Sequence, residues 1–305
     1  GHGVVMGGGA ESIRVGVVGV GHLGQHHARI YAEMPNAELV AVADLSEARG
    51  REVGGRLKVP AVTDYRSLIG QVDAVSVAVP TGAHYPITLS FLQAGVDVLV
   101  EKPIARSVEE ADVLIAAAAK GGRILQVGHS ERYNGAVRAL SAQVQEPGFI
   151  EVHRMGPFPG RGTDVDVVLD LMIHDIDIVL TLVKSPVTAV SAVGVPVVSG
   201  QVDIANARLE FASGCVANIT ASRVSGERLR KIRVFQRDTY FVLDYASQEL
   251  SLFRKSPGDG SGKNRLTRFE VPVARVEPLR QELDDFLESI RTRRPPLVAG
   301  EAGRE

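Results

Sequence analysis

The sequence has very little cysteine, and Cys215 is the only one among its 305 residues. A lone thiol excludes a disulfide framework and a thiolate metal site. No apolar run reaches the roughly 18 residues of a membrane-spanning helix, and lysine and arginine form no dense run. The formal net charge of −2 gives no basis for a nucleic-acid partner. We therefore expect a cytoplasmic protein with neither a nucleic-acid nor a membrane partner.

The length of the chain and its two contrasting halves predict two domains. Residues 1–12 contain no secretory signal and are expected to be a flexible tail or a tag remnant. In residues 13–130, short β-rich runs alternate with helix-forming segments, which is typical of βαβ units and a parallel sheet. We expect Ser107 to cap the helix that follows it. The expected strands of this dinucleotide-binding domain are 13–18, 38–43, 74–79, 96–100 and 124–127.

Residues 131–305 have a different pattern, with one strand-like run after another and turn signals between them. Consecutive runs of this kind imply an antiparallel or mixed sheet. Helices are expected at about 170–183 and 278–292, and the second is amphipathic and able to pack back on the first domain. The fold class is therefore predicted as α/β plus α+β, with a doubly wound parallel sheet followed by a mostly antiparallel one. The expected strands are 149–155, 188–198, 203–211, 215–223, 230–236, 240–245, 249–254 and 266–271.

The stretch G-V-G-H-L-G follows the first expected strand and opens a helix. In a dinucleotide site Gly19 permits the tight turn, Gly21 lets the pyrophosphate approach the backbone, and Gly24 allows close packing of helix on strand. Asp44 lies twenty residues further on, at the end of the second strand, where a carboxylate accepts hydrogen bonds from ribose hydroxyls. It also repels a 2′-phosphate, so NAD is favoured over NADP. A solvated turn aspartate is the alternative for Asp44.

Two further groups of polar residues are candidates for chemistry. Glu101-Lys102-Pro103 follows a parallel strand, so Lys102 can point into the ligand crevice and stabilise a developing alkoxide; an exposed salt bridge is the alternative. On a helical wheel Asp170, His174 and Asp177 fall on one stripe of an otherwise apolar helix. A histidine one turn after a carboxylate suits proton transfer, although a structural histidine remains open, and no third ligand supports a metal site.

Together these motifs resemble the Gfo/Idh/MocA (glucose–fructose oxidoreductase / inositol 2-dehydrogenase) family of sugar dehydrogenases. The resemblance covers nearly the whole chain from Ile13. It rests on G-V-G-H-L-G at 19–24, V-P-T-G-A-H at 79–84, E-K-P at 101–103, V-G-H-S-E-R-Y-N at 127–134, D-L-M-I-H-D-I-D at 170–177 and R-R-P-P-L-V-A-G at 293–300. The family implies an N-terminal Rossmann domain and a C-terminal domain whose open, mostly antiparallel sheet often mediates homodimers or homotetramers.

The resemblance also implies roles for individual residues. It places Lys102 near the nicotinamide, Asp170 on the substrate and His174 as general acid/base, and it implies no metal. The cofactor contacts that we carry over are Gly19, Gly21, His22, Leu23, Gly24, Asp44, Pro80, Thr81, His84, Glu101 and Lys102. The substrate contacts are Arg132, Tyr133, Asn134, Arg154, Arg161, Asp170 and His174. The arginines suit a pyrophosphate, with solvated surface arginines as the alternative.

The sequence departs from the family at Val165-Asp166-Val167 and at Met172, where many members carry glycine. These departures argue against a free hexose or inositol as substrate. The motifs D-L-M-I-H-D-I-D and H-S-E-R-Y-N are most similar to those of the subgroup of UDP-N-acetylglucosamine 3-dehydrogenases. We therefore predict an NAD-dependent oxidoreductase that oxidises a secondary sugar hydroxyl, at C3 of a UDP-N-acetylhexosamine, for 3-amino sugar biosynthesis in lipid A or other glycans. The alternatives are a dehydrogenase of a free polyol or hexose such as myo-inositol, and a non-catalytic NAD-binding sensor.

Overall fold

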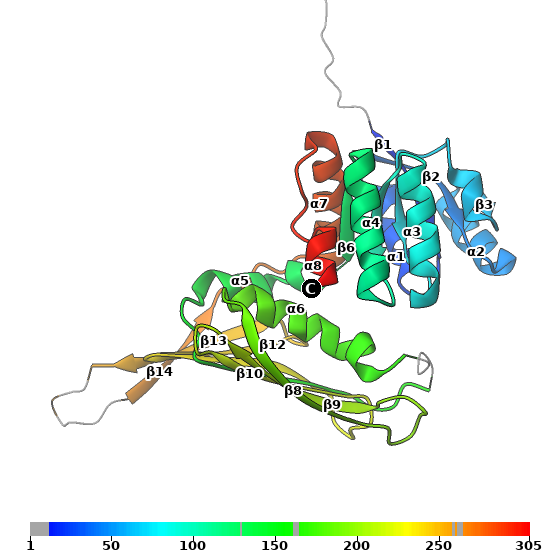
Figure 1. The fold of residues 1–305 in the computed structure, drawn as a ribbon. Coiled ribbons are helices and arrows are strands. Elements are labelled where there is room, and N and C mark those ends of the chain that lie inside the picture. Colours follow the sequence, from blue (N-terminus) through cyan, green and yellow to red (C-terminus); the bar gives the residue numbers. More distant parts are fainter. Residues whose placement is uncertain (1–11, 129, 161–164, 258–259, 261–264) are drawn as a thin grey trace, which may run out of the picture. The chain divides into compact units, whose positions relative to one another are not determined.

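A computed structural model describes residues 12–128, 130–160, 165–257, 260 and 265–305. The chain divides into two compact units (Figure 1). The first consists of the chain up to His129 together with Leu279–Glu305, and the second is Ser130–Pro278. Among the described helices, none is long and apolar enough to cross a membrane.

The first unit is built on a six-stranded sheet in which all neighbouring strands run parallel. This confirms the predicted doubly wound parallel sheet. Because both faces are covered by helices, its central strands are nearly continuous apolar runs, and Val15, Val17 and Val98 are fully buried. The strand order is β3 (Ala61–Val62), β2 (Ala37–Ala43), β1 (Ile13–Val18), β4 (Ala74–Val77), β5 (Asp97–Glu101) and β6 (Leu125–Gly128).

Helices connect these strands, and α3 packs beside α4 (Figure 1). Ser107 caps α4 as predicted, because its hydroxyl accepts a hydrogen bond from the Glu110 N–H. The two-residue strand β3 was not predicted, since two residues are too few to show a period. The elements are α1 (Gly24–Glu33), α2 (Glu47–Leu57), η1 (Tyr65–Leu68), η2 (Thr81–Ala83), α3 (His84–Gln93) and α4 (Val108–Gly121).

The end of the chain lies in the first unit. The sequence range 131–305 assigned it to the second domain but allowed the helix at 278–292 to pack back on the first. The helix α7 (Pro278–Thr292) is amphipathic, and its apolar side chains Leu283, Phe286 and Leu287 are fully buried in the core of the parallel sheet. Burial of this apolar face stabilises the packed helix, because it removes apolar surface from water. The short helix α8 (Gly300–Arg304) packs against α4 and β6.

The second unit contains an eight-stranded sheet, and the predicted mostly antiparallel pairing is confirmed. The exception is the parallel pair of β7 with β10 at the centre of the sheet. Residues alternate between buried and partly exposed along β7 and β9, so one face carries the core. The strand order is β14 (Arg265–Val271), β13 (Glu249–Ser256), β12 (Thr239–Asp244), β11 (Leu229–Gln236), β7 (Phe149–Met155), β10 (Val216–Ser222), β9 (Ile204–Phe211) and β8 (Val187–Val195).

The helices of this unit lie along one face of the sheet (Figure 1). They are η3 (Ser130–Tyr133), α5 (Gly135–Gln143) and α6 (Ile173–Leu182), and a π-helical segment, Val168–Met172, precedes α6. The π segment corrects the helical wheel, which assumed 100° per residue from residue 170 onward. A π turn advances less per residue than an α turn, so Asp170 is not in the α-helical register of His174 and Asp177.

Candidate functional site

The glycine loop after β1 is close-packed against the backbone around it. Gly19 has φ of +87°, and a Cβ there would lie 2.6 Å from the Ala78 carbonyl oxygen. A Cβ on Gly24 would overlap the carbonyl oxygen of Gly19. Only glycine fits at these two positions, which is the packing that the sequence motif predicts.

The space above the loop is open in the way that a bound diphosphate would require. A Cβ on Gly21 would meet only Arg49 Nη1, at 3.7 Å. The helix α1 begins at Gly24, and no side chain caps its N-terminus. Uncapped N–H groups and the positive end of the helix dipole attract an anion. The residues of this loop therefore fit a dinucleotide.

Asp44 follows β2 and is fixed by the backbone around it. Its two carboxylate oxygens accept hydrogen bonds from the N–H groups of Val20, at 3.0 Å, and Ser46, at 2.8 Å. Arg49 Nη1 lies 3.8 Å from the carboxylate, and its side chain is about half exposed. A carboxylate held at this place is suited to accept hydrogen bonds from ribose hydroxyls.

A cavity of about 790 Å³ extends from the glycine loop to Lys102. It lies entirely within the first unit, at the carboxyl ends of β1, β2, β4 and β5, where ligands bind in open α/β sheets. The described residues that line it include nine of the predicted cofactor contacts: Gly19, Gly21, Leu23, Asp44, Pro80, Thr81, His84, Glu101 and Lys102. Two predicted contacts do not line it, since Gly24 is buried beneath the loop and the exposed His22 packs its ring near His26.

His84 joins two segments of the cavity wall. One ring nitrogen, Nδ1, lies 2.7 Å from the Pro103 carbonyl oxygen, and Nε2 lies 2.8 Å from that of Val79. Burial lowers the pKa of His84 even though both carbonyls favour its charged form. This side chain is 2% exposed, so it holds the segments after β4 and β5 together.

Glu101 and Lys102 both line the cavity, and the Glu101 carboxylate also contacts the interior of the first unit. One carboxylate oxygen of Glu101 lies 2.7 Å from Nε2 of the fully buried His27, whose other ring nitrogen contacts the Ser76 hydroxyl at 3.0 Å. A Cβ on Gly128, directly across the β5–β6 pair, would overlap the Glu101 carboxylate. The strand end that carries Lys102 is therefore fixed by polar contacts on its inner side.

In the second unit, Asp170 lies on the π segment and is partly exposed. Its Oδ2 is 3.7 Å from Nη1 of Arg223, whose side chain is almost fully buried. The Arg223 guanidinium also donates to the Val165 carbonyl, at 2.7 Å, and to Asp203, at 3.0 Å. The cation is therefore held in place beside Asp170 by its other two partners.

His174 lies at the start of α6, and its side chain is 24% exposed. Its Nδ1 is 3.5 Å from Oε2 of Glu131, whose Oε1 is 3.7 Å from Arg154 Nη1. Glu131 was overlooked in the sequence, although it lies in the H-S-E-R-Y-N run. Its contact with His174 joins residues that are far apart in the chain, so no local period indicates it.

The predicted substrate contacts at residues 132–134 make ion pairs, hydrogen bonds or packing contacts within the protein. Arg132 forms a two-pronged ion pair with Asp177, and the Asn134 side chain accepts from the N–H groups at the start of α5. Tyr133 is 1% exposed. Asp177 is thus buried against Arg132.

Arg154 is engaged in the same way. It donates two hydrogen bonds to the buried Asp175, at 2.9 and 3.1 Å. Burial opposes its charge, but the carboxylates of Asp175 and Glu131 outweigh this and raise the pKa of Arg154. Asp175 therefore has a structural role, and the guanidinium of Arg154 is already held by carboxylates. Arg161, the remaining predicted arginine, lies outside the described residues.

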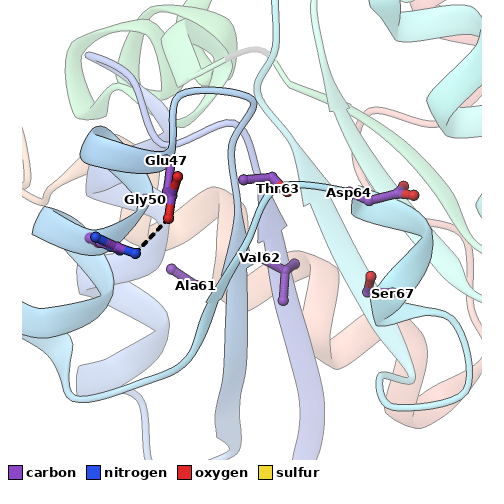
Figure 2. A pocket seen from close by; sticks show the side chains of 8 residues that line it. Glu47, Gly50, Ala61, Val62, Thr63, Asp64 and Ser67 are labelled. Carbon is purple, nitrogen blue, oxygen red and sulfur yellow. Dashed lines mark hydrogen bonds and ion pairs between the residues drawn. The ribbon is translucent and has the colours of Figure 1, made fainter.

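A smaller pocket, of about 410 Å³, lies at the edge of the first unit between α2 and the segment from β3 to η1 (Figure 2). Its wall includes Glu47 and Arg51, which pair with each other at 2.5 Å. It contains none of the predicted site residues and is therefore not the candidate site. In the described part of the chain, no cluster of three or more His, Cys, Asp or Glu residues could hold a metal ion.

Comparison with known proteins follows the same two units. Residues 13–129 match the model of the Gfo/Idh/MocA oxidoreductase family with an NAD-binding Rossmann fold, and residues 132–239 match the GFO/IDH/MocA C-terminal domain. The chain is 38% identical to a UDP-N-acetylglucosamine 3-dehydrogenase of Acidithiobacillus ferrooxidans, over 96% of this chain and 93% of that protein. It is 29% identical to a myo-inositol 2-dehydrogenase of Thermotoga maritima, over 96% of this chain and 92% of that protein.

A solved structure of UDP-N-acetylglucosamine 3-dehydrogenase GnnA from Acidithiobacillus ferrooxidans has the same fold, with a TM-score of 0.90. The match covers 96% of this chain and 93% of that one, at 38% identity. Both domain models match this chain, and a relative of this identity matches it along almost the whole length. The chain belongs to the Gfo/Idh/MocA family of oxidoreductases, whose Rossmann domain binds a nicotinamide cofactor.

Proposed function

We propose that this enzyme oxidises the C3 hydroxyl of a UDP-N-acetylhexosamine, such as UDP-N-acetylglucosamine, to a ketone with NAD, for 3-amino sugar biosynthesis. The observation that carries the proposal is the 38% identity to the UDP-N-acetylglucosamine 3-dehydrogenase, which extends over both units. A partial match, limited to the Rossmann unit, would say nothing about the sugar.

The proposed mechanism uses three side chains of this chain. When bound, the nicotinamide supplies the hydride acceptor. His174 removes the proton of the reacting hydroxyl, because an imidazole exchanges protons near neutral pH. Lys102, which lines the cofactor cavity, steadies the negative charge that develops on the oxygen, and Asp170 orients the sugar.

NAD is the proposed cofactor, and NADP is less favoured. The support is the Asp44 carboxylate, which the backbone N–H groups of Val20 and Ser46 hold at the end of β2. It would accept hydrogen bonds from the ribose hydroxyls and repel a 2′-phosphate.

The arginines have different proposed roles. Arg132 and Arg154 are each paired with a carboxylate of α6, so we propose that they position this helix and reach the substrate only through it. Arg161 remains proposed for the diphosphate. Tyr133 and Asn134 are both buried, so we propose that they stabilise the packing of the second unit beneath the substrate site.

The second candidate function is oxidation of a free polyol, supported by the 29% identity to the myo-inositol 2-dehydrogenase over the same span. A panel of UDP-N-acetylglucosamine, UDP-N-acetylgalactosamine, myo-inositol and glucose separates the two, with formation of reduced nicotinamide as the readout. We expect turnover with a UDP-N-acetylhexosamine. Turnover with inositol or glucose alone would support the second candidate, and a sensor would turn over none of them.

We also propose that the enzyme is a homodimer or homotetramer formed through the second-unit sheet, in the cytoplasm. All nine residues of β8 are exposed, among them Val190 and Val193, at 62% and 61%. Apolar surface of this kind, on an edge strand, is commonly covered by a partner. Light scattering tests the assembly, and Val190→Glu together with Val193→Glu should lower the molar mass.

A further inference from the structure

Glu131 is the residue whose position the proposed mechanism leaves unexplained. Its two carboxylate oxygens face two different partners: Oε1 lies 3.7 Å from Arg154 Nη1, and Oε2 lies 3.5 Å from His174 Nδ1. Both Glu131 and His174 are about three-quarters shielded from solvent, with side chains 21% and 24% exposed. In such partly dry surroundings a carboxylate interacts more strongly with its neighbours than in bulk water.

The cation behind Glu131 cannot turn away from it. Arg154 is fixed by the two hydrogen bonds to Asp175, and its guanidinium lies 5.1 Å from the centre of the Tyr245 ring. Asp175 is the residue after His174 on α6, so Arg154 ties Glu131 to the same helix turn that carries the histidine. Among the described residues, Arg230 on β11 also interacts electrostatically with both Arg154 and Glu131.

We propose that Glu131 is a positioning residue that fixes the tautomer of His174, an inference that rests on the proposed function of that histidine. The carboxylate lies 3.5 Å from Nδ1 and favours the proton on that nitrogen, so that the lone pair of Nε2 serves the substrate. During oxidation the hydroxyl O–H bond breaks and an Nε2–H bond forms, while the hydride from the same carbon goes to the nicotinamide cofactor. The imidazolium returns the proton when the ketone is reduced.

The arrangement predicts an unusual order of kcat among variants of Glu131. In Glu131→Gln, Arg154 Nη1, which Asp175 does not engage, will hold the amide oxygen, so the amide NH₂ faces His174 Nδ1. Nδ1 must then accept, and the proton moves to Nε2, where it blocks the base. We expect kcat to fall roughly 100-fold or more, as in other enzymes where a wrong tautomer is imposed. Glu131→Ala should lose less, because no donor imposes the wrong tautomer, and Glu131→Asp should retain the most activity.

A purely structural role predicts the opposite order, since glutamine has the shape of glutamate and should be the mildest change. The substrate with the highest wild-type turnover is used, kcat and KM are determined separately, and NADH binding is measured by fluorescence. Equal melting temperatures and NADH affinities show that the variants are folded. Glu146→Gln, an exposed residue of the same unit, is the matched control and should behave as the wild type. A Glu131→Gln variant more active than Glu131→Ala would overturn the proposal.

A spectroscopic measurement tests the same point without any substrate. The chain has eight histidines, and ¹⁵N-histidine spectra with His174→Ala as the assignment standard identify the ring of interest. At a pH where the ring is neutral, we expect the Nδ1–H tautomer in the wild type and the Nε2–H tautomer in Glu131→Gln. The Nε2–H tautomer in the wild type would contradict the proposal. If His174→Ala keeps full turnover while the tautomer changes as expected, the proposed function fails and the assignment of Glu131 stands.

Discussion

At the scale of single residues, backbone packing decides the shape of the cofactor loop. Gly24 sits so close to the Gly19 carbonyl that a Cβ would overlap it, and Asp44 is fixed by two backbone N–H groups. These features are local in sequence, because a tight turn and a strand end each involve a few consecutive residues. That is why the glycine motif and Asp44 were predictable from the sequence.

We predict that Gly24→Ala destabilises the protein by about 1–3 kcal/mol and weakens NADH binding at least tenfold, because the backbone of the loop must move. Thermal unfolding and NADH fluorescence titration measure the two effects. Gly55→Ala on α2 is the control, since no atom lies within 4 Å of a Cβ there. It should be neutral or up to about 1 kcal/mol more stable. Unchanged NADH affinity in Gly24→Ala would show that the loop does not hold the diphosphate.

For Asp44→Ala we expect the preference for NAD over NADP, measured as the ratio of kcat/KM values, to fall roughly tenfold or more. The carboxylate that repels the 2′-phosphate is gone, and the exposed Arg49 remains nearby to attract it. Asp64→Ala removes an exposed carboxylate paired only with Arg66 among the interactions described for it, and it should leave the ratio unchanged. Equal use of NAD and NADP by the wild type would contradict the role of Asp44.

At the scale of elements, long-range contacts limited what could be predicted. The strands of the second unit follow from alternating residues, but the π segment before α6 does not, because a helical wheel assumes a constant turn per residue. The contacts of Glu131 with His174 and of Arg132 with Asp177 join different elements. A single sequence shows which residues are polar, but it does not show which of them meet.

The connection between β8 and β9 depends on one buried carboxylate. Burial of Asp203 would raise its pKa, but the Ser199 hydroxyl and the N–H groups of Val198, Ser199 and Val197 outweigh this and hold the pKa well below its usual range. A lowered pKa means that the stabilisation is complete above the usual aspartate range and is lost as the pH falls toward the folded-state value.

We therefore expect Asp203→Asn to melt several degrees below the wild type at pH 7, with the gap narrowing as the pH is lowered to about 2. Melting curves across this pH range provide the measurement. Asp238→Asn, at an exposed turn, should follow the wild type throughout. A gap that stays constant with pH would show that the ionisation of Asp203 contributes nothing to stability.

At the scale of the whole molecule, the chain leaves the first unit at His129 and returns to it at Leu279. The returning helix α7 buries Phe286 completely in the core of the parallel sheet. Its amphipathic pattern and its ability to pack back on the first domain were inferred from the sequence, but a hydrophobic stripe does not identify the side chains that it meets.

Phe286→Ala should destabilise the cofactor-binding unit by about 3–5 kcal/mol, because it leaves a cavity in a close-packed core. Denaturant unfolding, with bound NADH as the reporter of the first unit, measures the loss. Arg291→Ala, on the exposed side of the same helix and paired with Glu288, should change stability by less than about 1 kcal/mol. A loss of similar size in both variants would argue against this packing.

The proposed reaction removes hydride from C3 of a UDP-N-acetylhexosamine. UDP-N-acetylglucosamine with deuterium at C3 tests this step, with the reduced nicotinamide and the sugar product analysed by mass spectrometry and NMR. We predict that deuterium leaves the sugar for the cofactor, that the product carries a carbonyl at C3, and that His174→Ala or Lys102→Ala lowers the rate at least 100-fold. Deuterium retained at C3 during turnover, or no turnover of any UDP-N-acetylhexosamine alongside rapid oxidation of myo-inositol, would contradict the claim.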